Sequence, residues 1–123
     1  MKADAKKKLA KIAAVFKALG HPTRLRIVRR LNEGECCVCD LVEETGADFS
    51  TVSQHLSVLK RVGVVEDDKR GKHVFYSLVY PCIPWLIDRM EERDSMTREQ
   101  IAAMEARSRK LSAKKPAKGT AKK

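Results

Sequence analysis

Four cysteines are the residues of this chain with the most distinctive chemistry. Cys36, Cys37 and Cys39 fall within four consecutive positions, and Cys82 stands apart from them. Cysteines this close together cannot hold a fold together by disulfides, whereas their thiolates bind soft metal ions and react with oxidants. We therefore expect a thiol-based ligand site or a thiol switch, with one of the cysteines serving only as a small buried apolar side chain.

The clustered cysteines stand at the start of a predicted helix over residues 38–45, with Cys37 at its N-cap and Cys39 in its first turn. Unpaired N–H groups and the helix dipole favour an anionic thiolate at that end. Side chains two residues apart on a helix point in different directions, so we expect this turn to distort when both sulfurs hold one ion. A thiophilic ion with three sulfur ligands needs one more, and the sequence leaves Cys36 and Cys82 open as candidates.

A second group of polar side chains lies on the next predicted helix. Asp48 is a good N-cap for it, and Val52, Leu56 and Leu59 form its inward face. No acidic residue occurs from 49 to 65, whereas an ordinary solvated surface mixes both signs of charge. We therefore expect the outer face to contact base edges in the major groove of DNA. Its polar residues are Ser50, Thr51, Ser53, Gln54, Ser57 and Lys60.

A β-hairpin is predicted after Gly63, where the apolar period changes from helical to alternating. Its strands are expected at 64–66 and 73–78, with a charged turn over Asp67 to Lys72 between them. Val74, Tyr76 and Leu78 are expected on the buried side. The turn carries a cationic tip that we expect to reach phosphates or the minor groove, formed by Lys69, Arg70 and Lys72.

The remaining elements are predicted to be helices. Apolar spacing indicates helices over 6–19 and from Pro22 to Gly34, and a last ordered one from Pro84 to about Arg93. Thr97 and Gln100 match a capping box that opens a further helical segment, fading near residue 111. We expect a mainly α fold with a β-hairpin, a winged helix-turn-helix, in three parts: 1–93 for DNA binding and dimerisation, 94–111 as a helical extension, and 112–123 as a disordered Lys-rich tail.

The overall charge favours a polyanionic partner. Lys and Arg number 26 against 16 Asp and Glu, which gives a formal net charge of +10. The excess gathers at the C-terminal end, where eight basic residues and no acidic one lie from Arg107 to Lys123. We expect this tail to add nonspecific, salt-sensitive affinity for DNA.

Nothing in the sequence predicts a membrane partner. No apolar stretch approaches the roughly 18 residues of a membrane span. The N-terminus lacks the apolar core of a signal peptide. The expected location is the cytoplasm, in association with the nucleoid.

Several ordered motifs between about Phe16 and Met90 resemble the ArsR/SmtB family of winged-helix repressors that respond to metals and metalloids. The motifs are Lys17-Ala-Leu-Gly-His-Pro-Thr-Arg-Leu-Arg-Ile-Val, Gly34-Glu-Cys-Cys-Val-Cys-Asp-Leu, Ser50-Thr-Val-Ser-Gln-His-Leu-Ser-Val-Leu-Lys and Arg70-Gly-Lys-His-Val-Phe-Tyr-Ser-Leu. The resemblance implies a homodimer, joined through its first and last helices, that binds double-stranded operator DNA and leaves it when an inducer binds. It places Ser50, Thr51, Ser53, Gln54 and His55 in the recognition helix.

The segment Cys37-Val-Cys-Asp-Leu resembles the family's thiolate motif for arsenite and antimonite, or for soft divalent ions such as cadmium and lead. The family's arsenic-responsive pattern commonly has a third cysteine at the position that Val42 occupies here. The family's other site, built from Asp and His on the last helix, is not matched, since Pro81 to Asp94 contains no His. His21, His55 and His73 are expected to be structural or DNA-facing rather than ligands.

The leading hypothesis is a transcriptional repressor released by arsenite, antimonite or another soft metal ion, with no cofactor needed for DNA binding. An alternative on the same fold makes Cys37, Cys39 and Cys82 a redox or persulfide switch. A thiol oxidoreductase is disfavoured because the chain lacks Cys-x-x-Cys in a βαβ setting, so no enzyme is expected. A nonspecific nucleoid-type DNA binder is the remaining alternative.

Overall fold

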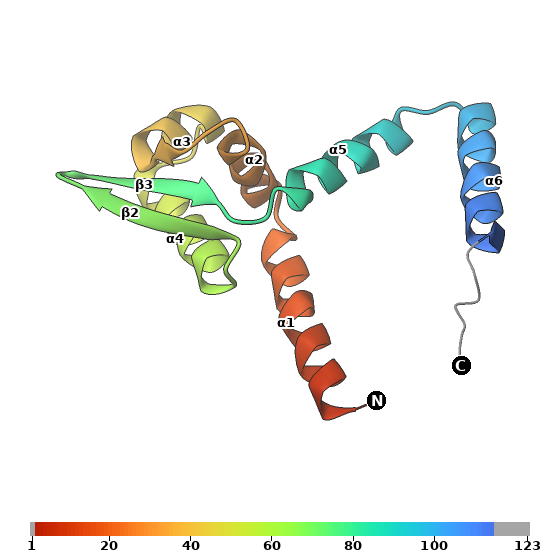
Figure 1. Ribbon diagram of the computed structural model, residues 1–123. Coiled ribbons are helices and arrows are strands. Elements are labelled where there is room, and N and C mark those ends of the chain that lie inside the picture. Colours follow the sequence, from red (N-terminus) through yellow and green to blue (C-terminus); the bar gives the residue numbers. More distant parts are fainter. Residues whose placement is uncertain (1, 115–123) are drawn as a thin grey trace. The chain divides into compact units, whose positions relative to one another are not determined.

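The computed structural model describes residues 2–114, in which six α-helices and three short β-strands follow one another (Figure 1). The elements are α1 (Ala3–Leu19), α2 (Pro22–Leu31), β1 (Cys36–Cys37), α3 (Val38–Thr45), α4 (Phe49–Arg61), β2 (Val65–Arg70), β3 (His73–Leu78), α5 (Cys82–Asp94) and α6 (Arg98–Lys114). The predicted mainly α fold with a β-hairpin is confirmed.

Local capping signals explain where the central helices begin and end. Pro22 opens α2, and the Nδ1 of His21 accepts a hydrogen bond of 3.1 Å from the backbone N–H of Thr23. The Asp48 carboxylate accepts one of 2.8 Å from the backbone N–H of Thr51 at the start of α4. Gly46 ends α3 at a φ of 73°, a left-handed conformation that glycine adopts without strain.

Helices α3 and α4 pack against each other over the core, which is the helix-turn-helix pairing expected from the sequence. The inward face of α4 is as predicted, because Val52, Leu56 and Leu59 are all fully buried. Leu41 of α3 is fully buried in the same core cluster. Burying a side chain of this size contributes about 1.5–3 kcal/mol, so this apolar seam holds the two helices at a defined angle.

The three strands form one antiparallel sheet in the order β1-β3-β2. β2 extends to Arg70 and pairs there with His73, so the turn is only Gly71 and Lys72, and the predicted turn over Asp67 to Lys72 is wrong. Gly71 has a φ of 61°, which suits such a tight hairpin. Apart from Val65 the residues of β2 are exposed, so charged side chains are tolerated there without the alternating pattern that marks a half-buried strand.

Strand β1 was not predicted and consists of only two residues. Cys36 is paired with Tyr76 of β3, and Cys37 is paired with Phe75. Such a short strand has no periodicity of its own, because its existence depends on pairing with a distant segment. The pairing brings the cysteine cluster beside the hairpin.

Contacts within the chain divide it into one compact unit that ends at Ile87 and a second that begins at Asp88. In the second unit, the N–H groups and side chains of Thr97 and Gln100 bond reciprocally, which confirms the predicted capping box before α6. Helix α6 continues to Lys114, so the expected disorder is wrong for residues 112–114, and the rest of the Lys-rich tail lies outside the described residues. The predicted domain limits at 93 and 111 stay a prediction.

The predicted apolar face of the first helix is present but lies on the surface of the chain. Leu9, Ile12 and Phe16 are 53%, 50% and 58% exposed, and only the end of α1, at Ala18 and Leu19, is buried. Trp85 near the start of α5 is also 58% exposed. Among the described helices, none is long and apolar enough to cross a membrane.

Candidate functional site

The outer face of α4 presents small polar side chains to solvent. Ser50 and Gln54 are exposed, whereas Thr51 and Ser53 are half-buried at its edges. Their hydroxyl and amide groups both donate and accept hydrogen bonds, as base edges in the major groove require. The hairpin of β2 and β3 lies beside α3 and α4, where a wing of a DNA-binding domain is expected (Figure 1).

His55 turns away from this face and contacts α2. Its Nδ1 accepts a hydrogen bond of 3.1 Å from the Nε of Arg24, and its ring centroid lies 4.5 Å from that of His21. Burial lowers the pKa of His55, and the charges of His21 and Arg24 lower it further. The ring of His55, which was expected to contact DNA, is thus engaged with Arg24 and His21.

Two of the basic residues expected to contact DNA are engaged in ion pairs. Lys60 lies 2.9 Å from the Asp67 carboxylate, which raises the pKa of Lys60. The Arg70 guanidinium donates to both oxygens of Glu35 at 2.6 and 2.9 Å, and to Asp68 at 2.9 Å. These bonds, with Glu35 first, raise the pKa of Arg70, and the bond from Arg70 lowers the pKa of Glu35.

The other two cations of the wing are available. Lys69 and Lys72 are exposed, and neither forms a salt bridge within residues 2–114. Arg70 lies between them with its guanidinium carbon 4.8 Å from the centroid of the Phe75 ring. The wing tip is cationic as predicted, with one of its three cations held against Glu35.

Two of the cysteine sulfurs converge at the start of α3. Cys37 is the N-cap in an extended conformation, with φ −83° and ψ 168°, and its N–H donates to the Asp40 carboxylate at 3.3 Å. Cys39 is the second residue of the helix. The sulfurs of both cysteines and a ring nitrogen of His73 all lie within 4.8 Å of one another. Because Cys37 is extended rather than helical, the two sulfurs lie near each other at a regular start of α3, and the distortion expected when both hold one ion stays a prediction.

His73 is the residue of this group that the sequence did not indicate. It begins β3, and Cys37 is paired with Phe75 two residues further along the same strand. Paired residues project to the same face of a sheet, as do residues two apart on one strand, so His73 shares a face with Cys37. No signal in the sequence predicts this, because it depends on the pairing of the unpredicted strand β1.

Neither cysteine expected as a third ligand joins the group. Cys36 is fully buried in the core, where its Sγ donates to the Gly34 carbonyl at 3.5 Å and burial raises the pKa of its thiol. Cys82 is exposed at the start of α5 and belongs to no cluster of three ligating side chains within the described residues.

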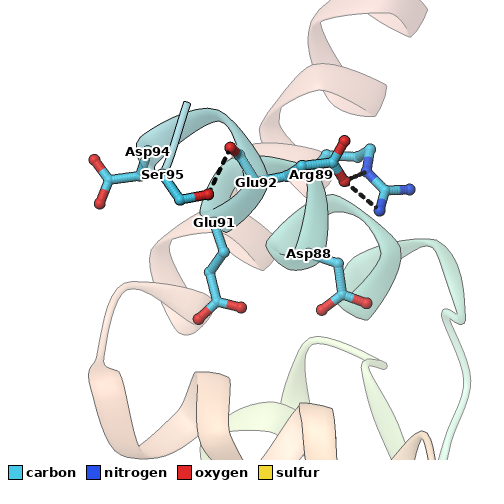
Figure 2. Close-up of a pocket in the computed structure, with 6 residues that line it drawn as sticks. All are labelled: Asp88, Arg89, Glu91, Glu92, Asp94 and Ser95. Atoms are coloured by element: carbon cyan, nitrogen blue, oxygen red, sulfur yellow. Dashed lines mark hydrogen bonds and ion pairs between the residues drawn. The ribbon is translucent and has the colours of Figure 1, made fainter. Parts of the chain in front are cut away.

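The second unit has an open depression lined mainly by acidic residues (Figure 2). Its lining residues are Asp88, Arg89, Glu91, Glu92, Asp94 and Ser95. Arg89 forms an ion pair of 2.8 Å with Glu92, and the Ser95 hydroxyl donates to the Glu92 carbonyl. Its carboxylates are not gathered tightly enough to form a ligand cluster within residues 2–114, and no histidine lies among them.

Comparisons with known proteins relate this chain to DNA-binding transcriptional regulators. The family described as bacterial regulatory protein, arsR family, matches residues 21–67. An uncharacterized HTH-type transcriptional regulator of Methanocaldococcus jannaschii is 40% identical over 86 residues, which cover 69% of this chain and 97% of that protein. A cadmium resistance transcriptional regulatory protein CadC homolog of Staphylococcus aureus is 46% identical over 80 residues, 60% of this chain and 66% of that protein.

A solved structure has the same fold. It is the homodimeric winged helix-turn-helix DNA-binding domain of a possible ArsR-family regulator from Mycobacterium bovis. That structure is 28% identical to this chain with a TM-score of 0.66, and the match covers 74% of this chain and 84% of that one. The predicted winged helix-turn-helix fold is therefore confirmed, and so is the prediction that the protein is not an enzyme.

Proposed function

Because this chain belongs to the arsR family of bacterial regulatory proteins, a family of DNA-binding transcriptional regulators, we propose that it is a repressor released from its operator by a thiol-binding inducer. Arsenite, antimonite or another soft metal ion would bind the thiolates of Cys37 and Cys39. The observation that carries this proposal is the convergence of those two sulfurs at the start of α3, the helix that packs against α4.

In the repressing state, α4 lies in the major groove and the hairpin contacts the adjacent backbone. The residues proposed to contact DNA are Ser50, Thr51, Ser53, Gln54, Lys60, Arg70 and Lys72. The ion pairs of Lys60 and Arg70 do not exclude them, because exposed pairs of this kind contribute only about 0–1 kcal/mol and phosphates can compete for the cations.

We further propose that the protein binds DNA as a homodimer in the cytoplasm. A single recognition helix makes few base contacts, and a two-fold pair doubles them over half-sites one helical turn apart. The exposed apolar side chains Leu9, Ile12 and Phe16 on α1 and Trp85 on α5 suit an interface through α1 and α5, the helices that the sequence predicted for dimerisation. The related domain from Mycobacterium bovis is described as homodimeric.

Release requires that the inducer bind the DNA-free conformation more tightly than the DNA-bound one. Leu41 of α3 and Leu56 of α4 are fully buried in one cluster, so a change at the start of α3 is transmitted to α4 by close packing. A ligand at the two sulfurs thus acts on the element that positions the DNA-contacting residues.

The test is a gel shift with the DNA upstream of the gene, titrated in parallel with arsenite, cadmium, zinc and peroxide under defined redox conditions. Cys37→Ser and Cys39→Ser are expected to keep operator affinity and lose release by the inducer. Cys82→Ser is the matched control and should still be released. If either of the first two variants loses DNA binding itself, these cysteines have a structural role and the proposal fails.

A second candidate is a redox or persulfide switch on the same fold. The observation favouring it is that Cys37 and Cys39 bring two thiols within 4.8 Å, one of them exposed. Peroxide would take two electrons and two protons from the pair, forming one S–S bond and two waters. This candidate predicts release by peroxide or sulfane sulfur and restoration by a dithiol, with no response to metal ions under reducing conditions.

A further inference from the structure

We propose that His73 is the third ligand of the inducer site, so that Cys37, Cys39 and His73 bind a divalent cation of the zinc group, Zn²⁺ or Cd²⁺. This inference rests on the proposed function and narrows its inducer. Its basis is that two sulfurs and one imidazole nitrogen, from the start of α3 and the start of β3, lie within 4.8 Å of one another.

The distances between the three ligand atoms, at most 4.8 Å, come close to those in an occupied zinc site. Zinc binds sulfur at about 2.3 Å and nitrogen at about 2.0–2.1 Å, which places neighbouring ligand atoms of a tetrahedron roughly 3.5–3.8 Å apart. The three atoms therefore need to approach one another by at most about 1.0–1.3 Å. Cys39 and His73 are exposed and Cys37 is half-buried, so changes of side-chain rotamer can supply this movement without disturbing the core.

The backbone holds the three residues in place before any ion binds. His73 is paired with Arg70 across the hairpin, while Cys37 is paired with Phe75 on the other side of β3. The imidazole of His73 also makes an edge contact with the Phe75 ring at 6.4 Å between centroids. On the opposite side, the Asp40 carboxylate accepts the N–H of Cys37 and fixes the extended N-cap. The entropy lost on binding is correspondingly small.

The donor set discriminates between inducers. Imidazole is a good ligand for zinc-like divalent ions, whereas a thiophilic metalloid such as arsenite is suited by three sulfurs. Within residues 2–114, Cys36 faces the core and Cys82 is outside the cluster, so no third sulfur stands beside the pair. Two thiolates and one imidazole leave a fourth position for water, which favours a divalent cation over arsenite or antimonite.

An ion in this site would also join the wing to the helix-turn-helix. Cys37 and Cys39 lie at the start of α3. His73 begins β3, directly after Lys72 of the hairpin tip. Binding would therefore restrain the wing relative to the recognition helix, as well as acting on α3. The proposed inducer would thus affect both DNA-contacting parts of the domain.

The test uses the full-length reduced protein with Co²⁺ as a spectroscopic probe and Cd²⁺ and Zn²⁺ in competition titrations. His73→Ala is expected to weaken Cd²⁺ and Zn²⁺ binding at least about 10-fold and to change the Co²⁺ ligand-field spectrum, while arsenite affinity stays unchanged. Imidazole NMR signals of His73 should shift on adding one equivalent of Cd²⁺. Glu66→Gln, an exposed change on strand β2 of the same hairpin that lies outside the cluster, is the control and should bind Cd²⁺ and Zn²⁺ as the wild type does.

The proposal is overturned if His73→Ala binds Cd²⁺ with wild-type affinity and spectrum, or if arsenite binding falls as much as Cd²⁺ binding. Far-ultraviolet circular dichroism of each variant checks that the fold is retained. Operator release is scored separately in the gel shift. A protein that binds Cd²⁺ through His73 yet keeps its operator contradicts the proposed function and leaves the metal site standing.

Discussion

Arg70 is the wing residue, among those proposed to contact DNA, that is engaged in ion pairs inside the protein. Its guanidinium is shared between Glu35 and Asp68, and it lies over the Phe75 ring. A phosphate that binds Arg70 must displace at least part of this arrangement. If Arg70 contacts DNA as proposed, Glu35 is therefore expected to lower the affinity of the wing for DNA.

Glu35→Gln is expected to raise affinity for nonspecific DNA several-fold and to steepen the salt dependence by about one unit of slope, because Arg70 becomes available to phosphate. The loss of an exposed ion pair should cost no more than about 1 kcal/mol of stability. Fluorescence anisotropy over a range of salt concentrations measures the slope. Glu66→Gln makes the same charge change on β2 away from Arg70, and an equal effect of both variants would refute the specific role of Glu35.

Gln54 is the residue on the outer face of α4 best suited to recognise a base. Its side chain is exposed, and a glutamine amide can pair with adenine through two hydrogen bonds worth about 1–3 kcal/mol of discrimination. Gln54→Ala should therefore weaken operator binding about 5- to 150-fold and leave binding to a scrambled duplex nearly unchanged. Lys72→Ala should instead weaken binding to both duplexes alike. Equal losses on both duplexes for Gln54→Ala would mean that this residue does not read sequence.

At the scale of elements, the contact between α2 and α4 depends on a neutral histidine. His55 of α4 accepts the Arg24 hydrogen bond through Nδ1, and burial lowers the pKa of its ring. Protonation would remove that acceptor and place a cation beside Arg24. The position of the recognition helix is therefore coupled to the charge of this side chain.

The sign of the pH dependence follows from that lowered pKa. The unfolded chain takes up a proton near His55's ordinary pKa of about 6.5, whereas the folded protein resists protonation. The contribution of His55 to the free energy of unfolding is fully present above about pH 6.5. It is lost as the pH falls from there through the lower pKa that His55 has in the folded protein. Urea unfolding between pH 5 and 8 should show this decline, and His55→Gln should reduce it. A wild-type pH profile in His55→Gln would contradict the assignment.

At the scale of the whole molecule, the exposed apolar stripe of α1, formed by Leu9, Ile12 and Phe16, is the surface proposed to contact a second copy of the chain. Phe16→Asp is expected to shift the protein from dimer to monomer at micromolar concentration, because it places a charge in the proposed interface. Analytical ultracentrifugation measures this change. Phe49→Asp is a matched control, since Phe49 at the start of α4 is 59% exposed and lies outside that stripe. A dimer that survives Phe16→Asp would place the interface elsewhere.

Local signals account for what the amino-acid sequence determined without the structure. Asp48 caps α4 and Gly46 ends α3 because capping and left-handed turns depend on residues within a few positions. Helical periodicity likewise predicted Val52, Leu56 and Leu59 as the buried face. The cysteines could be placed at the start of α3 for the same local reason.

Tertiary structure alone decided which side chains accompany those cysteines. Cys36 faces the core, and His73 stands beside Cys37, because two residues of β1 pair with β3 across a long stretch of chain. Such pairing is set by packing over the common core rather than by any pattern in the paired segments. The contacts of His55 with Arg24 and His21 were likewise decided by tertiary structure, because they come from the packing of α2 against α4, which the sequence of α4 alone does not predict.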